Sequence, residues 1–195
     1  KGPSVLRMGM EGTGKADSVR TLLEAGLNVF VVFSEPGMEV LLDPSRGRKV
    51  YTCRDGLHYR YIPVATPNWD DLRTAADHLN KFSFKALANE AATGRERYRA
   101  FYEIVDCMGN VKCQRCNQSF GPADRLEPYH KWAVVNDSLT SISKAALYLH
   151  IGNKPAVDKG EYGICMFNIE RYLDKFVGDI HSMTVMKAHV DMEPN

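Results

Sequence analysis

The fold is decided near the start of the chain by the stretch Val5-Leu6-Arg7-Met8-Gly9-Met10-Glu11-Gly12-Thr13-Gly14-Lys15. It predicts a short strand and a glycine-rich loop, and residues 17–25 then carry apolar side chains at Val19, Leu22 and Leu23, a spacing typical of a helix. Residues 29–33 are five consecutive apolar residues, which predict a strand buried on both faces. The order strand, helix, strand predicts an α/β fold with a mostly parallel central sheet flanked by helices.

The glycine-rich loop fits the pattern G-x-x-x-x-G-K between a strand and a helix. Its glycines allow consecutive backbone N–H groups to face a polyphosphate, and Lys15 can reach the β- and γ-phosphates. Nucleotide contacts are therefore expected from the loop and the start of the helix, at Gly9, Met10, Glu11, Gly12, Thr13, Gly14, Lys15, Ala16 and Asp17. Ala16 has no hydroxyl for Mg²⁺, although Asp17 or Ser18 could replace one through water. The loop thus favours nucleotide binding more strongly than metal-dependent hydrolysis.

Two acidic residues follow predicted buried strands. Asp137 comes shortly after the strand at residues 132–135, and Glu35 comes after the strand at residues 29–33. In an open α/β sheet, ligands bind beyond the carboxyl ends of the strands, where Asp137 would lie near a Mg²⁺-bound phosphate. Glu35 would face the γ-phosphate and polarise a water molecule.

Taken together, these features resemble the RecA-like ATPases, and most of all the phage-encoded members that act in single-strand annealing or recombination. Besides the loop, the similar stretches are Tyr59-Arg60-Tyr61, Ser119-Phe120-Gly121, Val135-Asn136-Asp137-Ser138-Leu139-Thr140 and Ala188-His189-Val190-Asp191. The resemblance implies that Lys15 binds phosphate, Asp137 holds Mg²⁺ through water, Glu35 activates water, and His189 senses the γ-phosphate. ATP and Mg²⁺ are the implied cofactors.

The same resemblance sets expectations for organisation and partners. Residues 1–195 are expected to form a single RecA-like P-loop NTPase domain with an irregular insert at about 44–130 and with the C-terminal part of its sheet missing or not represented. The resemblance also implies a homo-oligomer, as a ring or filament, that binds single-stranded DNA in the host cytoplasm. The polar stretch at 151–160 would supply one DNA-binding loop, with Lys154 and Lys159 as phosphate contacts.

Composition limits these expectations. The formal net charge is +1, so any DNA contact has to come from a local patch or from a surface assembled across subunits. No run approaches the ~20 apolar residues that span a bilayer, and the default is a cytoplasmic protein.

The middle of the chain is less regular. Residues 49–52 and 58–64 predict two strands with Asp55-Gly56 as a hairpin turn, and residues 70–81 and 86–105 predict helices. After them, regular α/β order returns with expected helices at 143–150 and 163–176 and a strand at 183–186, the last of these before His189.

The five cysteines favour reduced thiols over a disulfide framework, because they are odd in number and unevenly spread. Cys113 and Cys116 have the two-residue spacing of a zinc knuckle. Cys107 upstream and His130 downstream are the candidate third and fourth Zn²⁺ ligands. Thiols without a metal are the alternative.

Two other functions remain open. Residues 11–15 and 34–37 resemble stretches of thymidylate kinases, which would make the chain a nucleoside-monophosphate kinase. The sequence at residues 137–140 lacks the Asp-Arg pair expected of such a kinase and favours the RecA-like ATPase. Ala16 alone supports the third hypothesis, a nucleotide-binding protein without hydrolysis.

Overall fold

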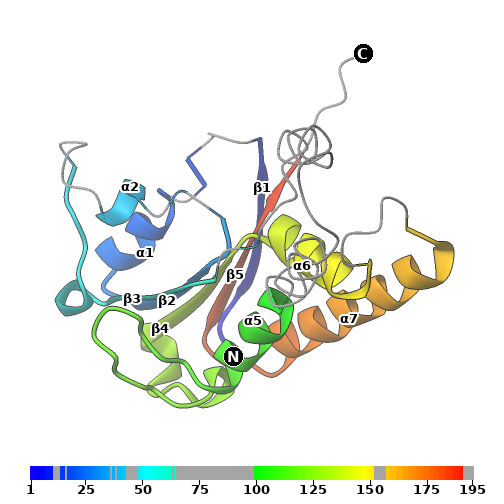
Figure 1. Ribbon diagram of the computed structural model, residues 1–195. Helices are drawn as coiled ribbons and strands as arrows, with labels where there is room; N and C mark the ends of the chain where they lie inside the picture. Colours follow the sequence, from blue (N-terminus) through cyan, green and yellow to red (C-terminus); the bar gives the residue numbers. More distant parts are fainter. Residues whose placement is uncertain are drawn as a thin grey trace, which may run out of the picture.

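One all-parallel sheet, with the strand order β1-β5-β4-β2-β3, forms the centre of the described structure (Figure 1). Its strands are β1 (Ser4–Gly9), β2 (Asn28–Phe33), β3 (Leu57–Tyr61), β4 (Trp132–Asp137) and β5 (Met183–His189). The computed structural model describes residues 1–10, 14, 15, 17–35, 37, 39–42, 48–62, 64, 99–151 and 157–190. The expected α/β class with a parallel central sheet is confirmed.

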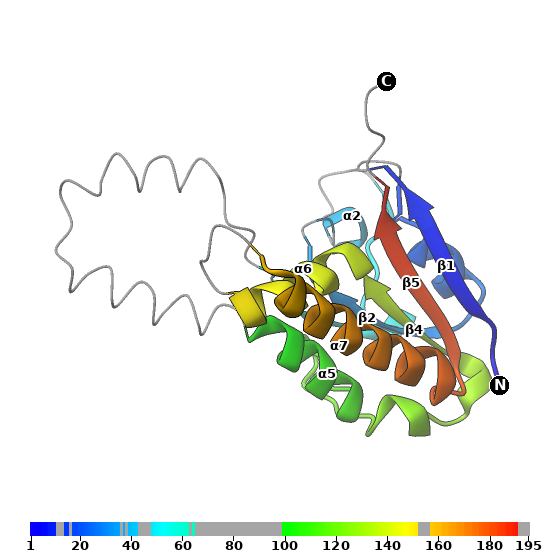
Figure 2. The ribbon, with the colours of Figure 1, turned by 90° about the vertical axis from the view of Figure 1, so that its right-hand side faces the viewer.

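Helices cover both faces of this sheet (Figure 2). On one face lie α1 (Val19–Glu24) and α2 (Glu39–Leu42). On the other face lie α5 (Ala100–Gly109), α6 (Leu139–Ile151) and α7 (Lys159–Gly178). Short 3₁₀ turns, η2 (Cys53–Asp55), η3 (Ala123–Arg125) and η4 (Tyr129–Lys131), occupy the connections.

Successive side chains of the buried strands point to opposite faces of the sheet and pack into two separate hydrophobic cores. In β2, Phe30 and Val32 point into the core under α5, α6 and α7, while Val29, Val31 and Phe33 pack under α1 and α2. This is why residues 29–33 read as a continuous apolar run, since both faces of the strand are covered.

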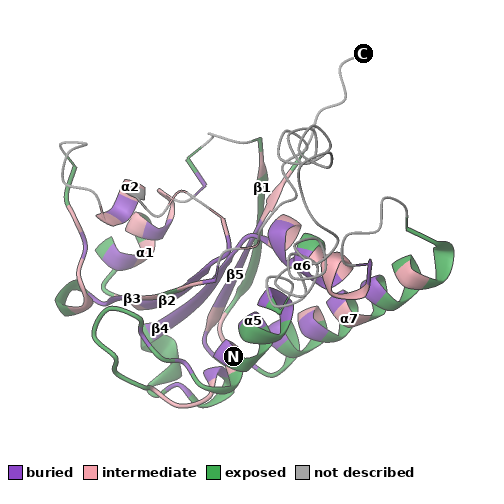
Figure 3. Ribbon diagram, viewed as in Figure 1, coloured by how far each residue is buried: buried purple, intermediate pink, exposed green. Residues whose placement is uncertain are grey.

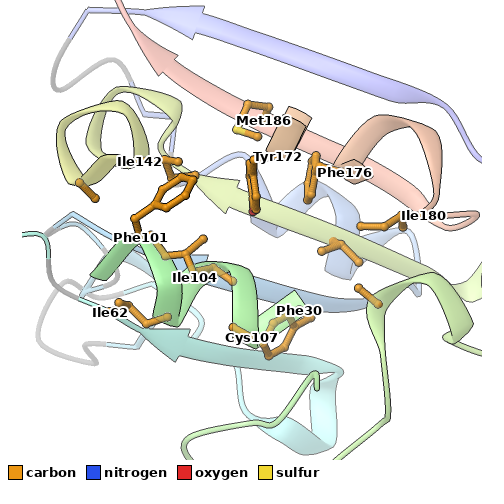
Figure 4. Close-up of a cluster of buried hydrophobic side chains, with 14 of the residues drawn as sticks. Phe30, Ile62, Phe101, Ile104, Cys107, Ile142, Tyr172, Phe176, Ile180 and Met186 are labelled. Carbon is orange, nitrogen blue, oxygen red and sulfur yellow. The ribbon is translucent and has the colours of Figure 1, made fainter. Parts of the chain in front are cut away.

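The larger of the two cores is shown in Figure 4, where aromatic and branched side chains from the sheet and from the helices on one of its faces interlock. Phe101 and Ile104 of α5 meet Tyr172 and Phe176 of α7 above Phe30 of β2, and all five are almost completely buried. Burial of each such side chain contributes about 1.5–3 kcal/mol. This packing fixes α6 and α7, and with them the strand ends they connect.

The two edges of the sheet differ. At the β3 edge, the backbone N–H of Gln114 donates to the carbonyl of Tyr59 (2.8 Å), and its side-chain Oε1 accepts from the N–H of Tyr61 (2.9 Å). At the opposite edge, β1 is exposed along most of its length (Figure 3), with Leu6 and Met8 57% and 64% exposed. The segment around Gln114 therefore covers the edge strand β3, whereas the edge strand β1 presents exposed apolar side chains.

The chain beyond β3 stays beside β2. Ile62 donates its N–H to the carbonyl of Phe33 (2.8 Å), and Val64 donates to the carbonyl of Ser34 (3.3 Å). Residues 62 and 64 thus run along the end of β2 and lead into residues 65–98, which lie outside the described residues.

The expected hairpin around Asp55-Gly56 is wrong. Residues 53–55 form the 3₁₀ turn η2, which Thr52 and Asp55 close as a capping box, and β3 pairs in parallel with β2. Gly56 ends this turn at φ 87° and passes so close to Asn28 that an added Cβ would lie 3.1 Å from its Oδ1. Asp55 and Gly56 do form a turn, but the strand that follows it, β3, pairs in parallel with β2 and not with residues 49–52.

Helix boundaries also differ from those expected. α6 and α7 begin four residues earlier than residues 143 and 163, and α1 is shorter than residues 17–25. The expected helix at 70–81 and the part of 86–105 before Arg99 lie outside the described residues.

Candidate nucleotide site and candidate metal centre

Three polar side chains from separate strand ends meet at the carboxyl edge of the sheet. Ser138 follows β4 and donates its hydroxyl to Oε1 of Glu35, which follows β2, at 2.6 Å. His189, the last residue of β5, places Nε2 2.5 Å from the other carboxylate oxygen, Oε2. Because parallel strands end on the same side, the topology alone brings these positions together. The carboxylate of Glu35 is held at both oxygens.

A layer of buried hydroxyls supports this cluster. Ser34 donates to the carbonyl of Asp137 (2.8 Å) and accepts from the N–H of Ser138 (3.0 Å). Ser138 accepts from the N–H of Ser141 (3.3 Å), as an N-cap residue of α6 does. Ser34 and Ser141 also contact each other through their hydroxyls. Neither Ser34 nor Ser141 was among the predicted site residues, although Ser34 directly precedes Glu35.

Lys15 lies against the start of its own loop. Its side chain is buried, and Nζ donates to the carbonyls of Gly9 (2.7 Å) and Met10 (2.5 Å). Gly9 is paired with His189 in the β1–β5 register, and its carbonyl also accepts from the N–H of Val190. The ammonium group of Lys15 is therefore one strand away from the cluster of Glu35, Ser138 and His189.

The other expected nucleotide contacts are only partly described. Gly14 has φ 74°, a conformation that glycine adopts without strain. Asp17 is engaged in ion pairs with Arg20 (2.6 Å) and Arg48 (3.1 Å). The expected contacts Glu11, Gly12, Thr13 and Ala16 lie outside the described residues.

Asp137 forms a buried ion pair that the sequence analysis did not predict. Its Oδ2 lies 3.0 Å from Nζ of Lys187, whose side chain is completely buried in β5. Burial lowers the pKa of Lys187, while the charge and the hydrogen bond of Asp137 act in the opposite direction. The residue expected to hold Mg²⁺ through water thus has one carboxylate oxygen paired with a lysine.

A second cluster of polar side chains lies near the start of the edge strand β3. The ligand atoms of Cys53, His58, Cys113 and Cys116 all lie within 4.8 Å of one another. Sγ of Cys53 is 3.7 Å from Sγ of Cys113, and Sγ of Cys116 is 3.8 Å from Nδ1 of His58. Three sulfurs and one imidazole nitrogen make up a donor set suited to a soft metal ion.

The four residues come from two parts of the chain. Cys53 begins η2 and His58 is the second residue of β3. Cys113 and Cys116 belong to a tight turn after α5, where residues 112 and 119 form an isolated antiparallel bridge and Asn117 has φ 59°. The side chain of His58 lies against the rings of Phe120 and Trp132, with centroids 4.6 and 5.8 Å away.

The electrostatics of Cys53, which is half-buried, and of Cys113, which is buried, differ. Burial and the neighbouring sulfurs raise the pKa of Cys53 to about 12. Burial also acts to raise the pKa of Cys113, but hydrogen bonds from the backbone of Cys116, Tyr59 and Arg115 bring it below its ordinary value. Of these two sulfurs, that of Cys113 is therefore better prepared to carry a negative charge.

This cluster corrects the expected metal ligands. Cys113 and Cys116 belong to it, but Cys107 lies on α5 within the hydrophobic core, and His130 lies in η4. Cys53 and His58 take the third and fourth ligand positions that were expected for Cys107 and His130. The signal that was missed is the spacing Cys53-x₄-His58 in an otherwise polar turn, which pairs across about sixty residues with the CxxC.

The expected DNA contacts give little geometry. Lys159 is exposed as the first residue of α7, directly after the N-cap Asp158, and Lys154 lies outside the described residues. Among the described helices, none is long and apolar enough to cross a membrane.

Comparison with known proteins does not identify a family. The sequence matches no protein-family model, and a search of curated proteins gives no match. What the protein does has to be inferred from its two candidate sites.

Proposed function

We propose that the protein is a RecA-like P-loop ATPase that binds ATP at the carboxyl edge of its sheet and acts on single-stranded DNA as a homo-oligomer, in phage recombination or annealing. The observation that carries the proposal is the cluster of Glu35, Ser138 and His189 one strand away from Lys15. A carboxylate, a hydroxyl and an imidazole converge there next to a buried ammonium group.

The chemistry of this cluster fits the hydrolysis of a phosphoanhydride. Glu35 is partly exposed and held at both carboxylate oxygens, so it is oriented before a substrate binds. An oriented carboxylate can accept a proton from an attacking water, and fixed positioning is a large part of catalysis in phosphoryl transfer. Glu35 is the general base of the proposal.

Lys15 supplies the positive charge for phosphate. Its ammonium group is satisfied by the carbonyls of Gly9 and Met10. A phosphate oxygen is a stronger acceptor than a carbonyl for this charged donor, so a bound triphosphate would draw Lys15 away from Gly9. Because the Gly9 carbonyl also accepts from Val190, beside His189, this movement would reach the end of β5.

Magnesium fits the protein side chains poorly. Ala16 offers no hydroxyl, and one oxygen of Asp137 is paired with Lys187. Mg²⁺ is commonly held by substrate phosphates and water with only one or two carboxylates, so water-mediated contact with Asp137 remains the arrangement we propose.

The exposed edge strand β1 supports the proposal of self-association. Val5, Leu6 and Met8 are exposed on it, and Met10 follows. Apolar side chains on an unprotected edge are typical of surfaces that another chain covers. A ring or filament would provide such cover.

Nucleotide binding and turnover by the full chain test the proposal. Binding of ATP is measured by calorimetry, and hydrolysis is measured by a coupled assay with and without single-stranded DNA. We expect ATP binding, and hydrolysis that single-stranded DNA accelerates. Lys15→Ala should weaken ATP binding at least tenfold and lower hydrolysis with it, while the remote control Lys175→Ala on α7 should change neither. Phosphoryl transfer to thymidylate, or binding without any turnover, would overturn the ATPase function.

A further inference from the structure

We propose that Cys53, His58, Cys113 and Cys116 bind one Zn²⁺ ion in a closed, structural site that clamps the edge of the sheet at β3. The inference is independent of the nucleotide site, because none of the four residues belongs to it. It starts from the geometry of the donors, whose ligand atoms all lie within 4.8 Å of one another.

The separations agree with a shared tetrahedral ion. Zn–S bonds of about 2.3 Å at tetrahedral angles place two sulfurs about 3.8 Å apart. The Sγ atoms of Cys53 and Cys113 are 3.7 Å apart, and Sγ of Cys116 lies 3.8 Å from Nδ1 of His58. A disulfide would bring two sulfurs to about 2.05 Å, so the cluster is arranged for an ion between the donors.

The surroundings hold the donors in place. Backbone groups of Tyr59, Arg115 and Cys116 form hydrogen bonds to the sulfur of Cys113. The ring of His58 is packed against Phe120 and Trp132, so its Nδ1 faces the sulfurs. Contacts of this kind, which orient the ligands, are typical of metal sites.

The donor set selects the metal and its role. Thiolates with an imidazole favour Zn²⁺ over hard ions such as Mg²⁺ or Ca²⁺. Four protein ligands leave no open coordination position for water or substrate, which is the mark of a structural site. The ion would stabilise the fold and take no part in chemistry.

The clamp joins segments that the chain brings together from far apart. Cys53 and His58 flank the start of β3, and Cys113 and Cys116 flank Gln114, the residue that hydrogen-bonds to the outer edge of β3. A metal ion bound to all four would hold Gln114 in register with Tyr59 and Tyr61. Without it, the segment around Gln114 would be held to β3 by those hydrogen bonds and by the packing of His58 against Phe120.

Metal analysis of the full chain, purified without chelator, tests the site. We expect about one zinc ion per chain, and a set of Co²⁺ absorption bands typical of tetrahedral thiolate coordination after exchange. Cys116→Ser, at the exposed ligand, should lose the zinc. Cys107→Ala and His130→Ala, which remove the same donor types outside the cluster, should keep it.

Two further measurements keep the test decisive if Cys116→Ser folds poorly. Cys116→His restores a ligand and should recover both zinc binding and thermal stability. Chelation should lower the melting temperature of the wild-type chain, and added Zn²⁺ should restore it. A metal-free chain with a Cys53–Cys113 disulfide in mass spectrometry, or equal zinc loss in Cys107→Ala, would overturn the proposal.

Discussion

The carboxylate of Glu35 and the imidazole of His189 are in contact, 2.5 Å apart, although strand β4 lies between the strands that carry them. Both side chains reach across the end of β4 above Ser138, which binds the second oxygen of the same carboxylate. A residue proposed to activate water and a residue proposed to sense phosphate therefore form one unit, in which neither can move without changing the other's hydrogen bonds.

Replacement of the proposed base should abolish turnover and leave binding intact. Glu35→Gln keeps the size and one acceptor oxygen, but it replaces the other oxygen by an NH2 group and removes the basic carboxylate, so ATP hydrolysis should fall by about 10²–10⁴-fold. ATP affinity, measured by calorimetry, should stay within about threefold, a change of less than 1 kcal/mol. Glu170→Gln, on the exposed side of α7, is the matched control. Equal hydrolysis rates in Glu35→Gln and wild type would show that water is activated elsewhere.

The contact between Glu35 and His189 predicts energetic coupling in turnover. His189→Ala leaves the Glu35 carboxylate bound by Ser138 alone, so hydrolysis should fall even though ATP still binds. In a double-mutant cycle with Glu35→Gln, the losses should not add, because residues in direct contact share one interaction. Strictly additive effects on the hydrolysis rate would mean that the two residues act separately.

Lys15 should carry most of the affinity for nucleotide. Lys15→Ala removes the buried ammonium group beside Gly9, and we expect ATP binding to weaken at least tenfold, about 1.4 kcal/mol or more. Thermal unfolding of the nucleotide-free variant separates lost affinity from lost structure, since the same two carbonyls lose their donor. An unchanged dissociation constant would contradict the assignment of the phosphate-binding loop.

The buried pair of Lys187 and Asp137 predicts a direction for a titration. The pKa of Lys187 should lie below its ordinary value of 10.5 in the folded chain, and Asp137→Asn should lower it further, because the carboxylate raises it. Carbon NMR of the lysine side chains measures both shifts. Asp174→Asn, a remote exposed carboxylate, is the control. A higher pKa in Asp137→Asn would contradict the ion pair.

The same shift has a consequence for stability. Between the folded pKa of Lys187 and 10.5, the unfolded chain binds the proton and the folded chain does not. The contribution of this lysine therefore makes folding more favourable as the pH rises through that window.

Position 16 offers a gain-of-function test. If the missing hydroxyl weakens the hold on Mg²⁺, Ala16→Thr should raise ATP hydrolysis and lower the Mg²⁺ concentration needed for half-maximal rate. The measurement is a Mg²⁺ titration of the hydrolysis rate, with Ala16→Val as the matched control of equal shape without the hydroxyl. A rate unchanged in Ala16→Thr would mean that another group already fills the position.

Local patterns in the sequence were sufficient to predict most of the sheet. The apolar runs around Val31 and Val134 predicted buried strands, because both faces of those strands are covered. The order of the strands could not be read from such runs, since pairing is non-local. The position of β1 at the edge, and the parallel pairing of β3 where a hairpin was expected, depend on packing that leaves no local trace.

The candidate sites divide in the same way. Glu35, Asp137 and His189 could be placed at the carboxyl ends of the strands because each lies at or just after a strand end, but the Lys187 partner of Asp137 lies within a strand and carries no motif. For the metal cluster, the CxxC spacing found two ligands. The other two ligands, Cys53 and His58, were missed because only the fold brings them close to Cys113 and Cys116. Cys107, which was predicted in their place, is buried in the hydrophobic core.

The backbone after β3 couples this edge strand to the end of β2. Val64 is hydrogen-bonded to the carbonyl of Ser34, and Ser34 adjoins Glu35. A pull on the chain at residue 64 would therefore be delivered to the end of β2 within one or two residues of the proposed base. The zinc ion that we propose at Cys53 and His58 would anchor the other end of β3, so sliding of the strand would absorb little of that displacement. Residues 62 and 64 therefore couple the position of β3 to that of the proposed base, Glu35.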